Sequence, residues 1–261
     1  MILIALVFVG LAGCTRQPAR PVELTVLTYN IHHAEGTDKK LDVERIANVI
    51  RALEPDLVAL QEVDVGTKRS DGADQAAELG RMTGMQHAHG PSMDFQGGKY
   101  GNAILTRIPL QLSTVVPLPH RPGGQREPRA ALAATVRLAP PDGRDIVFIS
   151  THFDHTGEAS DRVAQAEAVN AQLGSSPALS ILAGDFNCEP GSPPMVELEK
   201  QWTRVSDGGN SYPSAGPSKG IDHILVRPGD RWRVIESTVI AEPIASDHRP
   251  VMVKLMLLPG D

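Results

Sequence analysis

Six apolar segments of strand length, each bounded at one end by a polar residue able to do chemistry, constrain the fold of this chain most. The first four segments end on such residues and the last two begin on them: Asn30, Glu62, His152, Asp185 with Asn187 behind it, Asp222, and Asp247 with His248. Strand ends can present side chains while strand interiors stay packed. If some strands run antiparallel to the others, these residues meet on one rim. Carboxylates, amides and imidazoles on one rim indicate a hard-cation site with proton-transfer partners.

The order of helical and strand-like segments predicts an α/β fold with two mixed sheets. Apolar residues at helical spacing predict helices at 41–53, 73–82, 158–173 and from Pro193 onward. Strands are expected at 23–31, 56–62, 100–106, 110–118, 130–138, 145–151, 178–184, 221–227, 232–240 and 250–258. Four consecutive strands without a helix favour hairpins over a plain doubly wound parallel sheet. At 261 residues, one large domain with two stacked sheets flanked by helices is expected.

The N-terminus has the pattern of a secreted lipoprotein. Residues 1–13 are apolar and too few to span a bilayer, and LAGC ending at Cys14 resembles the bacterial lipobox, in which this cysteine is acylated. No Lys or Arg precedes the apolar segment, which a translation start placed too far downstream would explain; a buried N-terminal strand is the alternative. We therefore expect a signal peptide at 1–13, a lipidated Cys14 with a tether at 14–22, and a folded domain at 23–261 in the cell envelope.

The amino-acid composition limits the kinds of partner that this protein is expected to bind. With 25 basic and 31 acidic residues the chain carries a net charge of −6, so no broad cationic surface for nucleic acid is implied. Aromatic residues make up only 4%, which leaves few platforms for stacking bases. Cys188 is the only cysteine besides Cys14, so we expect no intramolecular disulfide and a packing role for its side chain.

Each motif also has a structural explanation when taken alone. Glu62 can be a solvated strand end, and GDFN at 184–187 can be an Asx turn. Asp247 and His248 adjoin just before an apolar strand, where neighbours face opposite ways, so that one can meet a metal and the other a substrate oxygen. His152 is interpreted as functional.

Two further groups of residues are open to either interpretation. Asp154 and His155 can form a turn into the next helix, and His32 and His33 can be a solvated pair. A zinc site is conceivable with so many histidines, although the sequence has neither an HExxH nor a paired CxxC pattern.

Seven motifs in order, TYNIHH, LQEV, YGNAILTR, STHFDH, GDFN, IDHILV and SDHRP, resemble those of the endonuclease/exonuclease/phosphatase family, which includes deoxyribonuclease I, AP endonucleases, sphingomyelinases and inositol polyphosphate phosphatases. The resemblance covers about residues 23–257. It implies a four-layer α/β/β/α sandwich and phosphoester hydrolysis that depends on Mg²⁺ or Mn²⁺.

The resemblance also implies roles for individual residues. Glu62 is the metal ligand, with Asn30 beside it and Asp247 near the ion. Asp185 orients or deprotonates the attacking water, His152 and His248 donate to phosphoryl oxygens, and Asp222 orients His248. The residues that hold the phosphate or its pocket are Asn187, Tyr100, Asn102 and one of Arg126 and Arg129. His32 stands where AP endonucleases carry an acidic residue, which counts against a second metal position made of carboxylates alone.

Three functions follow from these patterns. The expected function is metal-dependent hydrolysis of a phosphodiester or phosphomonoester by a lipid-anchored monomer. A secreted nuclease, or a phosphodiesterase of the sphingomyelinase or phospholipase type, is the alternative within this class. A binding module without catalysis is the third, and it predicts the loss of at least one acidic residue or histidine of the motifs, none of which is lost.

Overall fold

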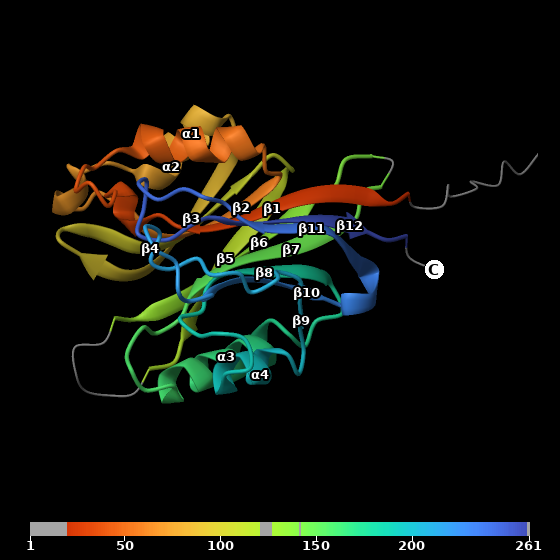
Figure 1. Cartoon of the computed structure of the whole chain (residues 1–261). Helices are drawn as coiled ribbons and strands as arrows, with labels where there is room; N and C mark the ends of the chain where they lie inside the picture. The colour runs from red at the N-terminus through yellow and green to blue at the C-terminus, as the bar shows by residue number, and fades with distance from the viewer. Residues whose placement is uncertain (1–19, 121–126, 141, 260–261) are drawn as a thin grey trace, which may run out of the picture.

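The computed structural model describes residues 20–120, 127–140 and 142–259. The expected signal peptide, Cys14, most of the tether and Arg126 lie outside these residues. Two six-stranded sheets pack face to face between two layers of helices (Figure 1), so the predicted four-layer sandwich is confirmed. No helix in the described ranges is long and apolar enough to cross a membrane.

The first sheet has the strand order β11-β12-β1-β2-β4-β3. Its strands are β1 (Val22–Asn30), β2 (Leu57–Val65), β3 (Gln86–Phe95), β4 (Gly98–Thr106), β11 (Trp232–Val239) and β12 (Val251–Leu257). The second sheet has the order β5-β6-β7-β8-β10-β9. Its strands are β5 (Leu110–Leu118), β6 (Arg129–Arg137), β7 (Asp145–His152), β8 (Leu179–Asp185), β9 (Thr203–Arg204) and β10 (Asp222–Arg227). Both sheets contain parallel and antiparallel pairs, as predicted.

The helices cover the outer faces of the sheets. They are α1 (Val43–Leu53), α2 (Gln75–Thr83), α3 (Ser160–Gln172) and α4 (Pro193–Leu198), with 3₁₀ turns η1 (His32–Ala34), η2 (Lys68–Ser70) and η3 (Gly229–Arg231). In Figure 1, α1 and α2 lie over the first sheet, and α3 and α4 lie over the second. The predicted helices are confirmed, except that Leu41 precedes α1 and forms an isolated bridge with Glu35.

Alternation along each strand divides the apolar residues among three layers. In β1, Leu24 and Val26 pack between the sheets, whereas Leu27 and Tyr29 face α1 and α2. The third cluster, beneath α3 and α4, includes Phe153, Phe186 and the free thiol of Cys188. Burial raises the pKa of that thiol to about 11, so the predicted packing role of Cys188 is confirmed.

Two strands were not predicted. β3 carries Gly90 and Pro91 in its middle and is half-exposed along most of its length, which obscures the apolar alternation of a strand. It lies at the edge of the first sheet, where an unpaired backbone tolerates proline. β9 is only two residues long.

Candidate active site

Three residues that are neighbours across the second sheet form the centre of the site. His152 at the end of β7 pairs in register with Asp185 at the end of β8, and Asp185 pairs with Asp222 at the start of β10. Because β7 and β8 are parallel and β10 is antiparallel to β8, two strand ends and one strand start share a rim. All three side chains are buried. The register confirms the common rim expected from the sequence.

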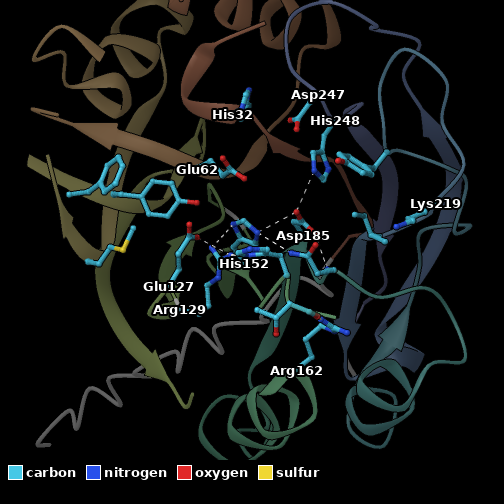
Figure 2. A pocket seen from close by; sticks show the side chains of 18 of the residues that line it. His32, Glu62, Glu127, Arg129, His152, Arg162, Asp185, Lys219, Asp247 and His248 are labelled. Atoms are coloured by element: carbon cyan, nitrogen blue, oxygen red, sulfur yellow. Dashed lines mark hydrogen bonds and ion pairs between the residues drawn. The ribbon is translucent and has the colours of Figure 1, made fainter. Parts of the chain in front are cut away.

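A β-bulge directs Glu62 into the same rim from the first sheet. The register of β2 against β4 shifts at this point, so that Gln61 and Glu62 together oppose Asn102. The Gln61 amide points between the sheets and donates to the Ser150 hydroxyl at 3.3 Å. Glu62 takes a left-handed φ of 59°, a conformation that costs free energy and recurs at functional sites. Its carboxylate consequently lines the cavity (Figure 2).

Asn30 joins the two sheets at the rim. Its amide nitrogen donates to Glu62 Oε1 at 3.0 Å and to Asp185 Oδ2 at 3.1 Å. Its amide oxygen accepts from the backbone N–H of His32 at 3.1 Å. Asn30 thus holds two carboxylates that come from different sheets, and its predicted role as a metal ligand stays a prediction.

Asp222 fixes the imidazole of His248. The Nδ1–H of His248 donates to Asp222 Oδ2 at 2.9 Å, and the Ser211 hydroxyl donates to the same oxygen at 2.5 Å. Burial lowers the pKa of His248, but the charges of Asp222 and Asp185 outweigh burial and raise it to about 10. His248 is therefore a cation at neutral pH, with Nε2 lying 3.6 Å from Asp185 Oδ2.

Asp247 and His248 do not open a strand, which corrects the predicted alternation of their side chains. β12 begins only at Val251, and both residues lie in the preceding loop. The Ser246 hydroxyl anchors that loop by donating to the Asn30 carbonyl at 2.7 Å and accepting from the His248 N–H at 3.3 Å. Both Asp247 and His248 line the cavity.

Asp185 is the carboxylate on which the other groups converge. Besides Asn30 and His248, it lies 3.4 Å from His152 Nε2, and its second oxygen accepts from the Asn187 N–H at 2.9 Å. Burial and, next, the like charge of Asp222 raise the pKa of Asp185 above its ordinary value. A carboxylate with a raised pKa is suited to accept a proton near neutrality.

Arg129 holds the imidazole of His152. Its Nη1 donates to His152 Nδ1 at 3.1 Å, and its Nη2 donates to His155 Nδ1 at 2.9 Å. Burial and, next, the positive charge of Arg129 hold the pKa of His152 well below its usual value. Since guanidinium is always a donor, His152 Nδ1 accepts from Arg129, while Nε2 lies 3.4 Å from Asp185 Oδ2 and 3.1 Å from the amide nitrogen of Asn187.

Arg129 is expected to act as a positioning residue, although it also lines the cavity and was predicted to bind phosphate. In Arg129→Met, we expect kcat to fall about tenfold or more and the pKa of His152 to rise toward its ordinary value, although burial, the larger cause, still holds it lower, so the acidic side of the pH profile shifts upward. Arg129→Lys is expected to restore part of the rate. The control is Arg137→Met, which removes an exposed pair with Asp145. A pH profile identical to that of the unmodified protein would contradict the role.

Tyr100 and Asn102, predicted near the phosphate, lie differently. Tyr100 lines the cavity and shares a hydrogen bond with Arg129, while burial raises the pKa of its phenol well above 10 and keeps it protonated. Asn102 does not line the cavity, because its amide nitrogen donates inward to the Ala130 carbonyl at 2.8 Å. A phosphate contact by Asn102 stays a prediction that this orientation does not support.

Asp154 and His155 were open to a structural or a functional interpretation, and the structure gives a different answer for each. The Asp154 carboxylate accepts from the Thr156 N–H at 3.0 Å, which confirms a turn before α3. His155 lines the cavity and holds Arg129.

The cavity has a volume of about 610 Å³, and loops contribute walls that the sequence motifs do not include. Arg69 lies with its guanidinium 4.6 Å from the ring centre of Phe95 and 5.3 Å from that of Tyr100. Tyr212, whose ring centre lies 4.7 Å from that of His248, and Lys219 also line the cavity. Arg69, Tyr212 and Lys219 lie outside the strands and follow no periodicity, so the sequence offered no signal for them.

Residues suited to bind a divalent metal ion lie beside Glu62. Its carboxylate and that of Asp247 both line the cavity, and they are the hard oxygen donors that Mg²⁺ and Mn²⁺ accept. His32, His33 and Glu62 also offer ligand atoms within 4.8 Å of one another. The donor set therefore fits a divalent cation at this end of the cavity.

The arrangement of two six-stranded sheets between helices, with the site on one rim, is the deoxyribonuclease I-like sandwich. A family model described as the endonuclease/exonuclease/phosphatase family matches residues 27–248. The chain belongs to this family, whose members are hydrolases of phosphoester bonds.

Solved structures agree with this assignment. A family protein from Beutenbergia cavernae is 28% identical, with a TM-score of 0.71 over 90% of this chain and 72% of that one. A family protein from Bacteroides thetaiotaomicron is 20% identical, with a TM-score of 0.75 over 92% and 96% of the two chains. A mannosyl-6-phosphatase from the same organism is 21% identical, with a TM-score of 0.70 over 89% and 99%.

Proposed function

We propose that this protein is a metal-dependent phosphoesterase that hydrolyses a phosphodiester or phosphomonoester by direct attack of water. One observation carries the proposal: the Asp185 carboxylate lies within 3.6 Å of Asn30, His152 and His248 on the rim of a cavity that Glu62 and Asp247 also line. A base, two imidazoles and a pair of metal-binding carboxylates are the groups that such a reaction needs.

Each residue of the site has its own role in the proposed reaction. Glu62 and Asp247 would hold Mg²⁺ or Mn²⁺, which supplies charge stabilisation at the phosphoryl oxygens. Asp185 accepts the proton that water loses as its oxygen bonds to phosphorus. His248, a cation held by Asp222, and neutral His152 donate to the nonbridging oxygens, where negative charge grows. The bond to the leaving oxygen breaks, and that oxygen takes up a proton on release.

The substrate is proposed to be a phosphorylated small molecule. A cavity of about 610 Å³ is far larger than a phosphate group and accommodates a substituent the size of a sugar or nucleoside. The similarity to a mannosyl-6-phosphatase, at 21% identity, supports a sugar phosphate as the first compound to test. A nuclease is the second candidate, and the net charge of −6 gives it no support.

We further propose that Cys14 carries a lipid anchor in the cell envelope. β1 begins at Val22 and ends at Asn30 on the rim of the site, so the strand carries the chain from one end of the sandwich to the other (Figure 1). The rim therefore lies roughly 27 Å from the end that the tether enters. This direction favours a soluble substrate over a lipid head group of the anchoring membrane.

Removal of divalent metal is expected to abolish hydrolysis, and adding it back is expected to restore the rate. The purified protein is assayed on bis-nitrophenyl phosphate, nitrophenyl phosphate, a hexose 6-phosphate, sphingomyelin, phosphatidylinositol and plasmid DNA, before and after dialysis against a chelator. Preference for the hexose phosphate supports the proposed class, and preference for plasmid nicking supports the nuclease. Failure on every substrate, with or without Mg²⁺ or Mn²⁺, would overturn the proposed function.

A further inference from the structure

The pair His32 and His33 is not used by the mechanism above, although it lies next to Glu62. Both residues belong to the 3₁₀ turn η1, directly after β1, and both take left-handed φ values, of 45° and 43°. The turn is held by the Ala34 N–H, which donates to the Ile31 carbonyl at 2.8 Å. It is also held by the Gln75 amide, which donates to the His33 carbonyl at 2.6 Å. The two rings are packed edge to face with centres 4.6 Å apart.

His32 is oriented as a metal-binding imidazole is. Its Nδ1 lies 3.0 Å from the Glu35 carbonyl, which can only accept, so Nδ1 carries the proton and Nε2 keeps a free lone pair. A backbone carbonyl on the far nitrogen is the usual means of fixing the tautomer of a ligating histidine. The His32 side chain lines the cavity together with Glu62 (Figure 2).

His33 supplies the second imidazole from a buried position. The residue is 93% buried, since its relative exposure is 7%. Its Nδ1 is buried without a hydrogen-bond partner among the described residues. A buried polar atom without a partner costs free energy, and a bound ion is one way to recover it.

We propose that His32, His33 and Glu62 together bind the metal ion, and that the site consequently prefers a later first-row cation such as Co²⁺, Ni²⁺ or Zn²⁺ over Mg²⁺. One ligand atom from each residue lies within 4.8 Å of the others. Bonds near 2.1 Å at tetrahedral angles place donors about 3.4 Å apart, so the three side chains need to close by up to about 1.4 Å to share one ion. Imidazole nitrogen selects later first-row metals, whereas Mg²⁺ prefers oxygen and keeps its water.

This inference concerns the ion of the proposed active site and rests on the proposed function for its meaning, but metal binding tests it without any substrate. The metal-free protein is titrated with Co²⁺ and with Mg²⁺ by calorimetry, and the visible absorption of Co²⁺ is recorded. We expect Co²⁺ to bind at least about a hundredfold more tightly than Mg²⁺. In the double variant His32→Asn with His33→Asn, Co²⁺ affinity is expected to fall about tenfold or more and its spectrum to change, while Mg²⁺ affinity stays within about twofold.

Asparagine is chosen for both positions because it tolerates the left-handed backbone and offers an amide oxygen in place of the imidazole nitrogen. His87→Asn, on an exposed residue of β3, is the matched control and is expected to bind both ions as the unmodified protein does. Circular dichroism checks that each variant is folded, and the single variants replace the double one if it is not.

Three outcomes would overturn the inference: equal affinity for Co²⁺ and Mg²⁺, an unchanged Co²⁺ spectrum in the double variant, or loss of Co²⁺ binding in Asp222→Asn instead. The last would assign the ion to the second group of neighbouring ligand atoms, Asp185, Asp222 and His248. Tight Co²⁺ binding that needs the two histidines, in a protein inactive on every phosphoester, would leave the inference standing and remove the proposed function.

Discussion

Asp185→Asn is expected to lower kcat by about three orders of magnitude and to leave the fold intact. The amide has the same shape as the carboxylate but cannot take a proton from water. Asn30, His152, Asn187 and His248 also all approach Asp185 within 3.6 Å. The loss should appear in kcat rather than in KM, because the predicted contact is with the attacking water and not with the substrate.

The same substitution is expected to raise the free energy of unfolding at neutral pH. Burial and the nearby Asp222 raise the pKa of Asp185 in the folded protein above its unfolded value. Ionised Asp185 therefore costs stability at every pH above its unfolded pKa, and a neutral amide does not carry that cost. Urea unfolding at pH 7.5 measures the gain, and a more stable but inactive protein is the expected combination for a catalytic carboxylate.

Asp145→Asn is the control for Asp185→Asn. Asp145 begins β7 at the opposite end from His152 and forms an exposed pair with Arg137. Its replacement is expected to change kcat by less than about twofold, since exposed pairs contribute little. An Asp185→Asn protein that keeps more than a tenth of the unmodified kcat would show that another group accepts the proton.

The rim of the site was predictable because the end of a strand can be recognised in the local sequence, and the strand ends determine which residues meet in the fold. An apolar run that stops at His152 or Asp185 marks the strand end in the sequence, and the mixed topology then brings these ends together. The parallel pair β7 and β8 aligns His152 with Asp185, and the antiparallel β10 aligns Asp222 with them. The sequence pattern thus predicts which residues form the centre of the site.

The orientation of the site side chains was less predictable than the positions of these residues at the strand ends. The bulge that redirects Glu62 depends on a register shift between β2 and β4 that no periodicity marks. Asn102 was expected to face phosphate, yet it donates to the Ala130 carbonyl of the second sheet. Arg129, one of two arginines expected at the phosphate, lines the cavity while its guanidinium holds two imidazoles, and its phosphate contact stays a prediction. For Asn102 a hydrogen bond across the two sheets decides the direction of the side chain, and for Arg129 hydrogen bonds to the end of β7 and to the loop behind it do so.

The walls of the cavity were not predictable at all. Arg69 reaches the cavity from η2 because buried Asp64 accepts from its Nε at 2.7 Å and its Nη2 at 2.9 Å. Tyr212 and Lys219 come from the loop between β9 and β10. Long-range contacts of this kind have no counterpart in local spacing, so substrate specificity is the part of the function furthest from the sequence motifs.

Asp222→Asn is expected to lower kcat by about two orders of magnitude and to change the pH dependence of what remains. Asp222 is the largest cause that raises the pKa of His248 to about 10, against burial, which lowers it. With Asp222 present, His248 stays cationic throughout the neutral range and contributes no loss of rate below about pH 9. With an amide at this position, burial dominates and the pKa of His248 falls toward or below its ordinary value.

The sign of the pH effect follows from the role of His248 as a donor. A cation that loses its proton as pH rises stops stabilising the phosphoryl oxygens, so kcat of Asp222→Asn should decline through pH 6–8, where the unmodified enzyme shows no such decline. Ser211→Ala, which removes only a neighbouring hydrogen bond to Asp222, should keep the profile of the unmodified enzyme and lose little rate. A uniform loss of rate in Asp222→Asn, with no new alkaline decline, would mean that Asp222 only positions the imidazole. The pH profile, rather than the size of the loss, therefore decides whether the buried carboxylate maintains the charge of His248.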